Sequence, residues 1–370
     1  MVNRFKVMTV FGTRPEAIKM APVIKEMELH SDKIKSIVTV TGQHREMLDQ
    51  VLNVFSIEPN YDLNVMKSNQ TLTDITVSIL QGIDAILKKE KPDVVLVHGD
   101  TTTTLASGLA AFYNKIPIGH VEAGLRTGEK YSPFPEELNR QLTGVIADFH
   151  FAPTNQAYLN LIGENINKNS VYITGNTAID ALKTTIKKNY CHEILKKIGK
   201  KKFILLTTHR RENLGESMKN IFKAIMELVS MHQDIEIVFP VHLNPAIQNL
   251  AREILGNHQR IHLISPLSVI DFHNFAARAY LILTDSGGVQ EEAPSLGTPV
   301  LVLRDTTERP EGVSAGTLKL VGTSVEGIVM NINNLLLDSV TYKNMSKSKN
   351  PYGDGLASKR IVEILIREFL

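Results

Sequence analysis

The chain has 370 residues, of which 43% are hydrophobic and 22% charged, and its formal net charge is +2. This composition is typical of a soluble globular protein of two domains, and the near balance of charge argues against nucleic-acid binding. The single cysteine, Cys191, excludes an intrachain disulfide and a cysteine-ligated metal site. Because no apolar run approaches the ~20 residues of a membrane helix and no signal-peptide core follows Met1, we expect a cytoplasmic protein without membrane contact.

Short β-branched runs alternate with longer amphipathic segments along the whole chain. The predicted strands form two series, 7–11, 37–40, 94–98, 116–121, 149–152 and 171–174, then 203–207, 235–240, 261–264, 280–283, 300–303 and 318–321. The clearest predicted helices are 15–29, 72–89, 136–146, 216–232 and 325–337. Strands that are apolar on both faces and alternate with helices predict parallel sheets covered on both sides. The fold class is therefore α/β, with two Rossmann-like, doubly wound domains.

The junction between the two domains is expected near Gly175, which follows a strand and precedes a lysine-rich stretch. This gives an N-terminal domain of residues 1–174 and a C-terminal domain of residues 175–355. In such folds ligands bind beyond the carboxyl ends of the strands, so the candidate residues are sought there.

The most distinctive strand end lies at 280–293. Here Ser286, Gly287 and Gly288 follow an apolar run and precede a predicted helix that carries Glu291 and Glu292. The glycines leave backbone N–H groups accessible, and the helix N-terminus adds partial positive charge, so a diphosphate fits there. The carboxylate of Glu292 is suited to accept hydrogen bonds from two ribose hydroxyls. An ordinary tight turn explains the same glycines, so this stretch alone leaves both interpretations open.

A second turn, at 11–19, ends the first predicted strand. Pro15 suits the first position of a helix and Glu16 its first turn, and Arg14 and Lys19 would flank that helix N-terminus as anchors for an anion. The turn matches neither the dinucleotide fingerprint nor the P-loop, and neither pattern occurs elsewhere in the chain. A dinucleotide cofactor and P-loop chemistry are therefore not expected.

Three carboxylates lie at comparable places. Asp100 and Glu122 each follow a predicted strand, and Glu136 begins a predicted helix after a proline-rich loop. Singly, Asp100 and Glu136 are explained as N-cap or first-turn acids worth about 1 kcal/mol. Converging with Arg14 and Lys19, they favour acid–base chemistry, because like charges raise one pKa while cations lower another.

The same strand ends carry His98 and His120, which raises the alternative of a metal site with Asp100 and Glu122. The carboxylates together with Arg14 and Lys19 nevertheless favour acid–base chemistry over metal binding.

The second half of the chain repeats the pattern. His209 and Arg210 follow one predicted strand, His242 follows the next, and Arg309 lies in the segment after 300–303. The carboxyl ends of parallel strands meet at one edge of a sheet, so these side chains can share a site. The second half is suited to holding a nucleotide, and the carboxylates of the first half to performing the chemistry.

Seven motifs together resemble one enzyme family. They are FGTRPE at 11–16, HGDTT at 98–102, HVEAGLR at 120–126, THRRE at 208–212, TDSGG at 284–288, DTTERPE at 305–311 and NPYGDG at 350–355. In this order, and over essentially the whole chain, they are similar to the non-hydrolysing bacterial UDP-N-acetylglucosamine 2-epimerases. The resemblance implies two domains facing a central cleft as in B-type glycosyltransferases, with a C-terminal helix at 356–370 crossing back to the first domain. It also implies a homodimer with no bound NAD or metal.

The reaction implied by the resemblance is reversible conversion of UDP-N-acetylglucosamine to UDP-N-acetylmannosamine, which supplies N-acetylmannosamine for surface polysaccharides. Direct loss of the C2 proton would give an unstabilised carbanion. Family members avoid it by anti-elimination of UDP to 2-acetamidoglucal followed by syn re-addition.

The family's functional residues carry over to positions of this chain. As acid–base or leaving-group residues the resemblance implies Asp100, Glu122, Glu136 and His209, without saying which carboxylate serves which step. As UDP-sugar contacts it implies Arg14, Lys19, His242, Phe272, Ser286, Gly287, Gly288, Glu292 and Arg309. A second, activating UDP-N-acetylglucosamine is expected near Gln43, His44, Gln70 and Arg210, although Glu46 and Asn69 differ there from some relatives.

Three alternatives stay open at this point. A hydrolysing epimerase would release UDP and free N-acetylmannosamine after the same elimination. A B-type glycosyltransferase would share the fold but has no evident use for three carboxylates. A nucleotide-sugar-binding sensor would bind UDP tightly and catalyse nothing.

Overall fold

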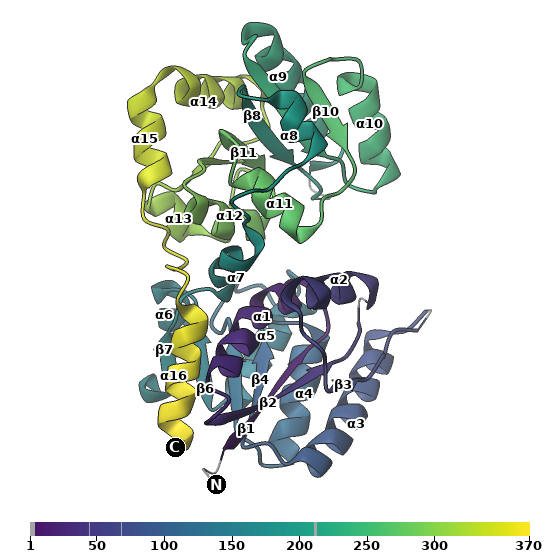
Figure 1. Cartoon of the computed structure of the whole chain (residues 1–370), viewed down its shortest axis with the longest axis vertical. Helices are drawn as coiled ribbons and strands as arrows, with labels where there is room; N and C mark the ends of the chain where they lie inside the picture. The colour runs from purple at the N-terminus through teal and green to yellow at the C-terminus, as the bar shows by residue number, and fades with distance from the viewer. Residues whose placement is uncertain (1–3, 44, 68, 211–212) are drawn as a thin grey trace. The chain divides into compact units, whose positions relative to one another are not determined.

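The structure, a computed structural model of the chain, describes residues 4–43, 45–67, 69–210 and 213–370. The chain folds into two compact units (Figure 1). Unit 1 comprises Met1–Thr184 and Tyr352–Leu370, and unit 2 comprises Thr185–Pro351.

The boundaries of these units differ from those expected near Gly175 and after Gly355. The helix that follows Gly175, α7 (Thr177–Thr185), buries Ala181 in the core of unit 1. The backbone N–H of Asn176 donates to the carbonyl of Tyr352 at 2.7 Å. Both segments therefore belong with unit 1.

Unit 1 is built on a seven-stranded parallel sheet in the order β3-β2-β1-β4-β5-β6-β7, as the apolar strands predict. The strands are β1 (Phe5–Phe11), β2 (Ile34–Val40), β3 (Tyr61–Asp62), β4 (Val94–His98), β5 (Ile118–Val121), β6 (Phe149–Ala152) and β7 (Val171–Ile173). The two-residue β3 was not predicted, because so short a strand has no periodicity to detect.

Helices cover both faces of this sheet (Figure 1). They are α1 (Arg14–Leu29), α2 (Arg45–Phe55), α3 (Leu72–Glu90), α4 (Thr102–Tyr113), α5 (Glu136–Ile146), α6 (Asn155–Gly163), α7 and α16 (Ala357–Phe369), with a 3-10 turn η1 (Lys168–Ser170). Successive residues of β1 point to opposite faces: Val7 packs in the core with α1, α2 and α16, and Met8 in the core with α3 and α4. None of the helices in the described ranges is long and apolar enough to cross a membrane.

The C-terminal helix α16 packs on unit 1. It buries Ile361, Val362 and Leu365 in the same core as α1. Its start is held by Asp180 of α7, which accepts hydrogen bonds from the backbone N–H groups of Ala357 at 3.2 Å and Ser358 at 2.9 Å. A carboxylate at a helix N-terminus also complements the helix dipole.

Unit 2 contains a six-stranded parallel sheet in the order β10-β9-β8-β11-β12-β13. The strands are β8 (Lys202–Thr207), β9 (Ile235–Pro240), β10 (Ile261–Ile264), β11 (Leu281–Thr284), β12 (Val300–Val302) and β13 (Leu318–Leu320). The helices are α8 (Glu193–Ile198), α9 (Glu216–Met231), α10 (Pro245–Leu255), α11 (Val269–Ala276), α12 (Gly287–Glu292), α13 (Pro310–Ser314), α14 (Val325–Leu337) and α15 (Ser339–Lys347), with a 3-10 turn η3 (Ala293–Leu296). Both sheets confirm the predicted α/β fold class.

Each sheet reverses its strand order once, between β1 and β4 in unit 1 and between β8 and β11 in unit 2. Ligands of doubly wound folds bind at such reversal points, outside the carboxyl ends of the strands. The loops after β1, β4, β8 and β11 are therefore the expected ligand-binding positions, and they carry Arg14, Asp100, His209 and Ser286.

Candidate active site

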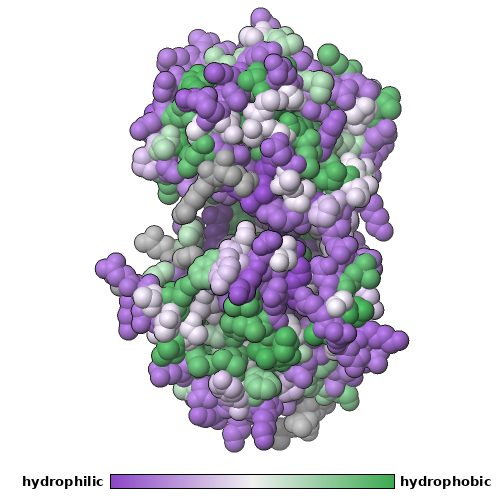
Figure 2. Space-filling view, turned by 180° about the vertical axis from the view of Figure 1, so that it is seen from behind, coloured by the Kyte–Doolittle hydropathy of each residue, from purple (hydrophilic) through white to green (hydrophobic). Residues whose placement is uncertain are grey.

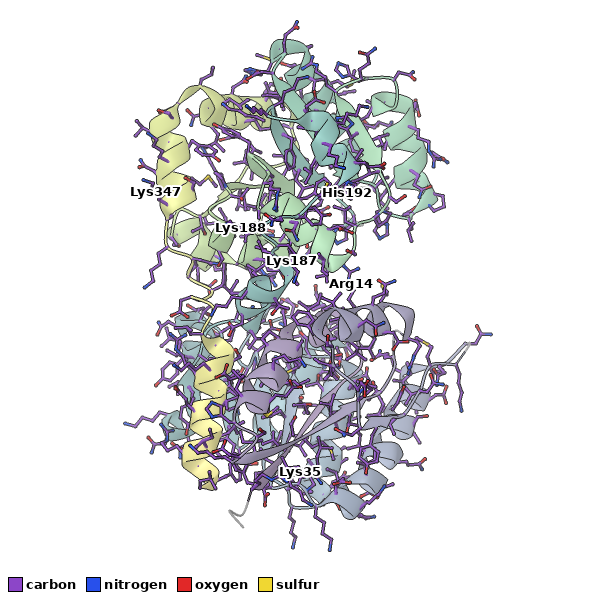
Figure 3. The ribbon with its side chains drawn as sticks, in the orientation of Figure 1. Arg14, Lys35, Lys187, Lys188, His192 and Lys347 are labelled. Carbon is purple, nitrogen blue, oxygen red and sulfur yellow. The ribbon has the colours of Figure 1, made fainter. Side chains whose placement is uncertain are left out.

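The carboxylates of unit 1 lie at the carboxyl edge of its sheet. Strands β4 and β5 are direct neighbours, with His98 paired to Val121, so Asp100 and Glu122 follow adjacent strand ends as predicted. Figure 3 shows Arg14, the first residue of α1, at the opposite end of unit 1 from Lys35 of β2. Arg14 is thus at the same edge as the two acids.

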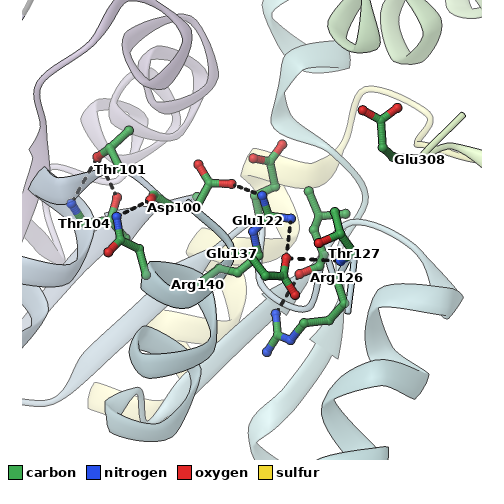
Figure 4. A network of polar contacts seen from close by, with 12 residues as sticks. Asp100, Thr101, Thr104, Glu122, Arg126, Thr127, Glu137, Arg140 and Glu308 are labelled. Carbon is green, nitrogen blue, oxygen red and sulfur yellow. Dashed lines mark hydrogen bonds and ion pairs between the residues drawn. The ribbon is translucent and has the colours of Figure 1, made fainter. Parts of the chain in front are cut away.

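Asp100 is held by α5. Its carboxylate Oδ2 lies 2.7 Å from Nη2 of Arg140, and its backbone carbonyl accepts a hydrogen bond from Nδ2 of Asn139 at 2.9 Å (Figure 4). Burial raises the pKa of Asp100 to about 6, against the opposing effect of the Arg140 guanidinium, and the charges of Glu122 and Glu136 raise it further. A carboxyl group with this pKa can gain and lose a proton near neutral pH, which general acid–base catalysis requires.

Glu122 occupies a left-handed backbone conformation, with φ of 63°. Residues other than glycine rarely adopt it, and such conformations cluster at functional sites. The carboxylate forms an ion pair with Nζ of Lys19, accepts a hydrogen bond from Nδ2 of Asn176 at 3.4 Å and lies 3.7 Å from Nε2 of the buried His98. Lys19, which was expected to bind phosphate, therefore also neutralises one of the predicted catalytic acids.

Glu136 begins α5, as predicted, and is half-buried. Its charge contributes to raising the pKa of Asp100, so the two carboxylates lie close enough to interact. The structure therefore brings Asp100, Glu122, Glu136 and Lys19 together at one edge of the unit 1 sheet.

A buried glutamate that sequence reasoning treated only as a first-turn acid connects two of these loops. Glu16 accepts hydrogen bonds from the backbone N–H groups of Gly12 at 3.0 Å and Thr13 at 2.7 Å, and from the hydroxyl of Thr101 at 2.7 Å. Thr101 directly follows Asp100. Burial raises the pKa of Glu16, although the hydrogen bonds from Thr101, Gly12 and Thr13 work to lower it. Glu16 thus ties the turn before Arg14 to the loop of Asp100.

In unit 2, the loop after β8 is organised by Asp285, which follows β11 and is fully buried. Asp285 accepts hydrogen bonds from the backbone N–H groups of His209 at 3.0 Å and Arg210 at 3.0 Å, from the Thr208 hydroxyl at 2.9 Å and from Nδ2 of Asn213 at 2.9 Å. The loop position of His209 is therefore set by one carboxylate.

The His209 ring also faces this carboxylate, with Nδ1 3.3 Å from Oδ1 of Asp285, while 44% of the side chain is exposed. Burial lowers the pKa of His209 even though Asp285 works to raise it. The ring stacks on that of His242, with 5.9 Å between centroids. Nδ1 of His242 accepts a hydrogen bond from the N–H of Asn244 at 3.1 Å, which leaves Nε2 of His242 as its other polar atom. The two predicted histidines thus form one pair.

The glycine turn after β11 is arranged as predicted, with Ser286 before α12 and Gly287 and Gly288 in its first turn. The helix is only six residues long and continues as η3, so Glu291 and Glu292 lie near its end. A Cβ atom at Gly287 would lie 2.7 Å from Cζ of Arg309, so this glycine allows the guanidinium to approach the turn.

Arg309 is held there by a buried partner. Its Nε donates to Oε1 of Glu291 at 2.9 Å and its Nη2 lies 2.8 Å from the same oxygen, while the Glu291 side chain is 3% exposed. Buried charges of this kind are normally paired. Arg309 consequently places its guanidinium beside the Ser286–Gly288 turn.

Glu292, predicted to bind ribose, belongs to a chain of hydrogen bonds. Its Oε2 lies 3.1 Å from Nε2 of the buried His273, and Nδ1 of His273 lies 2.7 Å from the hydroxyl of Thr185. Phe272 precedes His273 in α11 and is half-buried. The structure thus places Phe272, Ser286, Gly287, Gly288, Glu292 and Arg309 around α11 and α12.

The residues expected to bind an activator are divided between the two units. In unit 1, Oε1 of Gln43 accepts a hydrogen bond from Thr103 at 3.2 Å, and Nε2 of Gln70 donates to the carbonyl of Val65 at 2.8 Å. Arg210 belongs to unit 2, where it pairs with Glu308 at 3.1 Å. His44 lies outside the described residues.

Within the described ranges, no group of three or more histidine, cysteine, aspartate or glutamate side chains is arranged to hold a metal ion. Nε2 of His120 instead lies 2.7 Å from the carbonyl oxygen of Gly99, and burial lowers its pKa to about 3. Burial likewise lowers the pKa of His98 to about 4. Both rings are therefore neutral at pH 7.

Four supporting residues were missed by sequence reasoning: Arg140, Glu137, Asp285 and His273. Arg140 follows Glu136 by four positions and Glu137 by three on a predicted helix, a spacing that brings side chains together. Asp285 lies inside the recognised TDSGG motif. His273 gave no local signal, because its partners Thr185 and Glu292 are distant in sequence.

The known proteins that are similar to this chain point to one family. The family described as UDP-N-acetylglucosamine 2-epimerase matches residues 27–366. The UDP-N-acetylglucosamine 2-epimerase of Bacillus subtilis is 63% identical over 365 residues, covering 99% of this chain and 96% of the relative. The crystal structure of a protein from Listeria monocytogenes is 55% identical with a TM-score of 0.96, covering 99% and 97% of the two chains. The Neisseria meningitidis epimerase bound to UDP-GlcNAc is 51% identical with a TM-score of 0.88, covering 98% and 100%.

Proposed function

Because this chain belongs to the UDP-N-acetylglucosamine 2-epimerase family, we propose that it catalyses the reversible epimerisation of UDP-N-acetylglucosamine at C2 without net hydrolysis. The observation that carries the proposal is the pairing of acids at neighbouring strand ends. Asp100 with a pKa of about 6 and Glu122 paired to Lys19 follow β4 and β5 side by side. Two carboxyl groups in different electrostatic surroundings are suited to opposite roles in proton transfer.

The proposed reaction has two steps. In the first, a carboxylate of unit 1 removes the C2 proton while the bond from C1 to the UDP oxygen breaks, giving 2-acetamidoglucal and UDP. In the second, a carboxylic acid returns a proton to C2 on the opposite face and the same UDP oxygen re-forms the bond to C1. Asp100, Glu122 and Glu136 supply these carboxyl groups. General acid–base assistance of this kind is typically worth 10²–10⁴-fold.

Unit 2 holds UDP in this proposal. Ser286, Gly287 and Gly288 present backbone N–H groups, and Arg309 supplies a positive charge beside them. His209 and His242, stacked after β8 and β9, contact the diphosphate. Glu292, oriented by His273, accepts hydrogen bonds from the ribose hydroxyls, and Phe272 lies against the nucleoside. No nicotinamide or metal cofactor takes part.

Proton NMR of UDP-N-acetylglucosamine with the purified protein in D₂O tests this proposal. We expect UDP-linked N-acetylmannosamine signals with deuterium at C2. Accumulation of free N-acetylmannosamine and UDP would assign the hydrolysing reaction instead. UDP binding with neither product nor C2 exchange would contradict enzymatic epimerisation and favour a binding protein.

We further propose that the chain forms a homodimer through unit 1. On α5, Leu138, Leu142 and Val145 recur at helical spacing and are 39%, 43% and 75% exposed, and Phe112 at the end of the adjacent α4 is 54% exposed. Figure 2, which views the molecule from behind, shows hydrophobic residues gathered on this face of unit 1. Apolar surface of this kind marks interaction sites. Light scattering should give twice the 41.2 kDa chain mass, and Val145→Asp should give the monomer.

A second UDP-N-acetylglucosamine molecule as activator is proposed for the surface of unit 1 near Gln43 and Gln70. Reaction started from UDP-N-acetylmannosamine should then be slow until UDP-N-acetylglucosamine is added, and Gln70→Ala should weaken the activation. A hyperbolic reverse reaction that needs no added UDP-N-acetylglucosamine would contradict the activator.

A further inference from the structure

Helix α5 buries several polar side chains on one face. Glu137, Asn139 and Arg140 are 0%, 6% and 9% exposed, whereas Leu138 and Leu142 face solvent. Charged residues are almost never fully buried unless they are paired, so this reversal of the usual amphipathic pattern calls for a specific set of partners. Those partners are the two loops that carry Asp100 and Glu122.

The first loop is held at two points. Nη2 of Arg140 lies 2.7 Å from the Oδ2 of Asp100, and Nδ2 of Asn139 donates to the Asp100 carbonyl at 2.9 Å (Figure 4). The backbone contact fixes where the residue lies, and the guanidinium fixes how its side chain is turned. Asp100 is thereby constrained at both its backbone and its carboxylate.

The second loop is held through Glu137. Its carboxylate accepts hydrogen bonds from the backbone N–H groups of Thr127 at 3.1 Å and Gly128 at 3.2 Å, both in the segment between β5 and α5. Nη1 of Arg140 lies 3.4 Å from Oε2 of Glu137. A continuous polar chain therefore runs from the loop after β5, through Glu137 and Arg140, to Asp100.

We propose that Arg140 is a positioning residue for epimerisation, which holds the Asp100 carboxylate ionised and oriented for proton transfer and couples it to the loop after β5. This inference rests on the proposed function, because it assigns Arg140 a role through Asp100. The planar guanidinium reaches both carboxylates at once, which the single ammonium of a lysine does less well.

The electrostatic surroundings of Asp100 define what losing Arg140 would do. Arg140 and Glu136 face it from α5, Glu122 from the loop after β5, and Lys19 from α1. Burial and the two glutamates raise its pKa, while Arg140, the larger of the two cationic effects, and Lys19 lower it. An opposite charge at this range typically lowers a carboxyl pKa by about 1–3 units. Removing Arg140 should therefore move the pKa of Asp100 upward from about 6.

The test measures the Asp100 pKa directly, in the full-length protein without substrate. Carboxyl carbons are followed by ¹³C NMR over pH 4–9, and the Asp100 signal is assigned by its absence in Asp100→Asn. We expect Arg140→Met to raise this pKa by about 1 unit or more and Arg140→Lys to raise it less. An unchanged pKa in folded Arg140→Met would overturn the proposal.

Kinetics give the second measurement. The acid limb of the kcat/KM profile should move to higher pH by the same amount in Arg140→Met, lowering the rate about fivefold at pH 6 for a rise of about 1 unit, with KM changed little. Asn139→Ala is the matched control, because it removes a contact to the Asp100 backbone but no charge. It should slow the reaction without moving the acid limb, and an equal displacement in both variants would contradict a role specific to Arg140.

Arg140→Met leaves the buried carboxylate of Glu137 without its cation, and this variant can therefore fail to fold. The double variant Arg140→Met/Glu137→Gln avoids this, because it removes both charges of the pair. The double variant should show the same raised Asp100 pKa, and a normal pKa there would also overturn the proposal. Since the NMR titration needs no turnover, failure of epimerisation itself would appear separately, as the absence of product in the wild-type protein.

Discussion

The loop after β4 in unit 1 and the loop after β8 in unit 2 are both held by a buried charge, but the two charges have opposite sign. In unit 1, the buried cation Arg140 faces the carboxylate of Asp100, which is 27% exposed. In unit 2, the buried anion Asp285 faces the ring of His209, which is 44% exposed. Each loop thus presents one titratable side chain whose partner is more deeply buried than the side chain itself.

The two partners differ in what they stabilise. Arg140 contacts the carboxylate of Asp100 and leaves the backbone of that loop to Asn139. Asp285 spends most of its hydrogen-bonding capacity on backbone N–H groups and on Asn213, with only Oδ1 near the His209 ring. We call each buried charge, together with the side chain that it faces, a clamp. The clamp of unit 1 (Arg140 and Asp100) should therefore act mainly on the charge of Asp100 and the reaction rate. The clamp of unit 2 (Asp285 and His209) should act mainly on loop position, stability and ligand binding.

The largest expected effect is that of Asp100→Asn, which removes the titratable group itself. We expect the epimerisation rate to fall about 10²–10⁴-fold. Stability should change in the opposite sense: because the folded pKa of about 6 lies above the ordinary 3.8, ionisation of Asp100 opposes folding, and this loss is complete once pH has risen through 6. The variant should be more stable by about 1–2 kcal/mol at pH 7.5 and no more stable at pH 4.

Urea unfolding at the two pH values measures this difference. Glu137→Gln is a suitable comparison, since the backbone N–H groups of Thr127 and Gly128 and the charge of Arg140 hold the pKa of Glu137 below its usual value in spite of burial. That substitution should destabilise the protein at pH 7.5. A destabilised Asp100→Asn at pH 7.5 would show that the charge of Asp100 supports the fold, contrary to the comparison made above.

The next largest effect is expected for Asp285→Ala. Its loss leaves the N–H groups of His209 and Arg210 without their acceptor and leaves Nδ2 of Asn213 with only the carbonyl of Leu303. A buried donor left unsatisfied costs about 1–3 kcal/mol, so the free energy of unfolding should fall by at least about 3 kcal/mol. Asp285→Asn keeps one acceptor oxygen and should lose less.

UDP binding by Asp285→Asn separates the two roles. If unit 2 acts through loop position, UDP should bind about tenfold more weakly by calorimetry, while the acid limb of kcat/KM stays where it is in the wild-type protein. A displaced acid limb with unchanged UDP affinity would mean that both clamps act on charge, and the distinction between the two units would fail.

The exposed residue of each clamp, Asp100 or His209, is predictable from the sequence, whereas the role of its buried partner largely is not. Asp100, Glu122 and His209 follow recognisable apolar strands, so their place at a sheet edge is predictable from local pattern alone. Arg140 and Asp285 act through partners 40 or more positions away, and only the packed sheet brings them into contact. No local periodicity contains that information.

The fold shows the same division. Strands of four or more apolar residues, such as β4 and β9, are predicted with their observed bounds, because a run of apolar residues indicates a buried strand. The end of unit 1 is not, since α7 belongs to it through long-range contacts, the packing of Ala181 and the hydrogen bonds from Ala357 and Ser358 to Asp180. Domain boundaries depend on such long-range contacts more than on local sequence.

A smaller effect is expected in the chain Thr185–His273–Glu292 of unit 2. His273→Phe keeps an aromatic ring but removes the hydrogen bond to Glu292, so the carboxylate loses its fixed orientation. A hydrogen bond to a charged group is worth about 1.5–3 kcal/mol, which predicts UDP binding weakened at least about tenfold. Binding of 2′-deoxy-UDP should weaken less, because it lacks one of the hydroxyls that Glu292 is proposed to bind.

The smallest effect is that of Thr185→Val, which preserves shape and removes only the hydroxyl that lies 2.7 Å from Nδ1 of His273. A neutral hydrogen bond contributes about 0.5–1.5 kcal/mol, so UDP affinity should fall about two- to tenfold. Because the Thr185 hydroxyl contacts the His273 ring and not one of the proposed catalytic carboxylates, kcat and its pH dependence should be those of the wild-type protein. Isothermal titration with UDP beside a kcat–pH profile separates the two quantities. A change in kcat with unaltered UDP affinity would show that the hydrogen-bond chain of unit 2 serves the chemical step, and would remove the division of labour on which the preceding predictions rest.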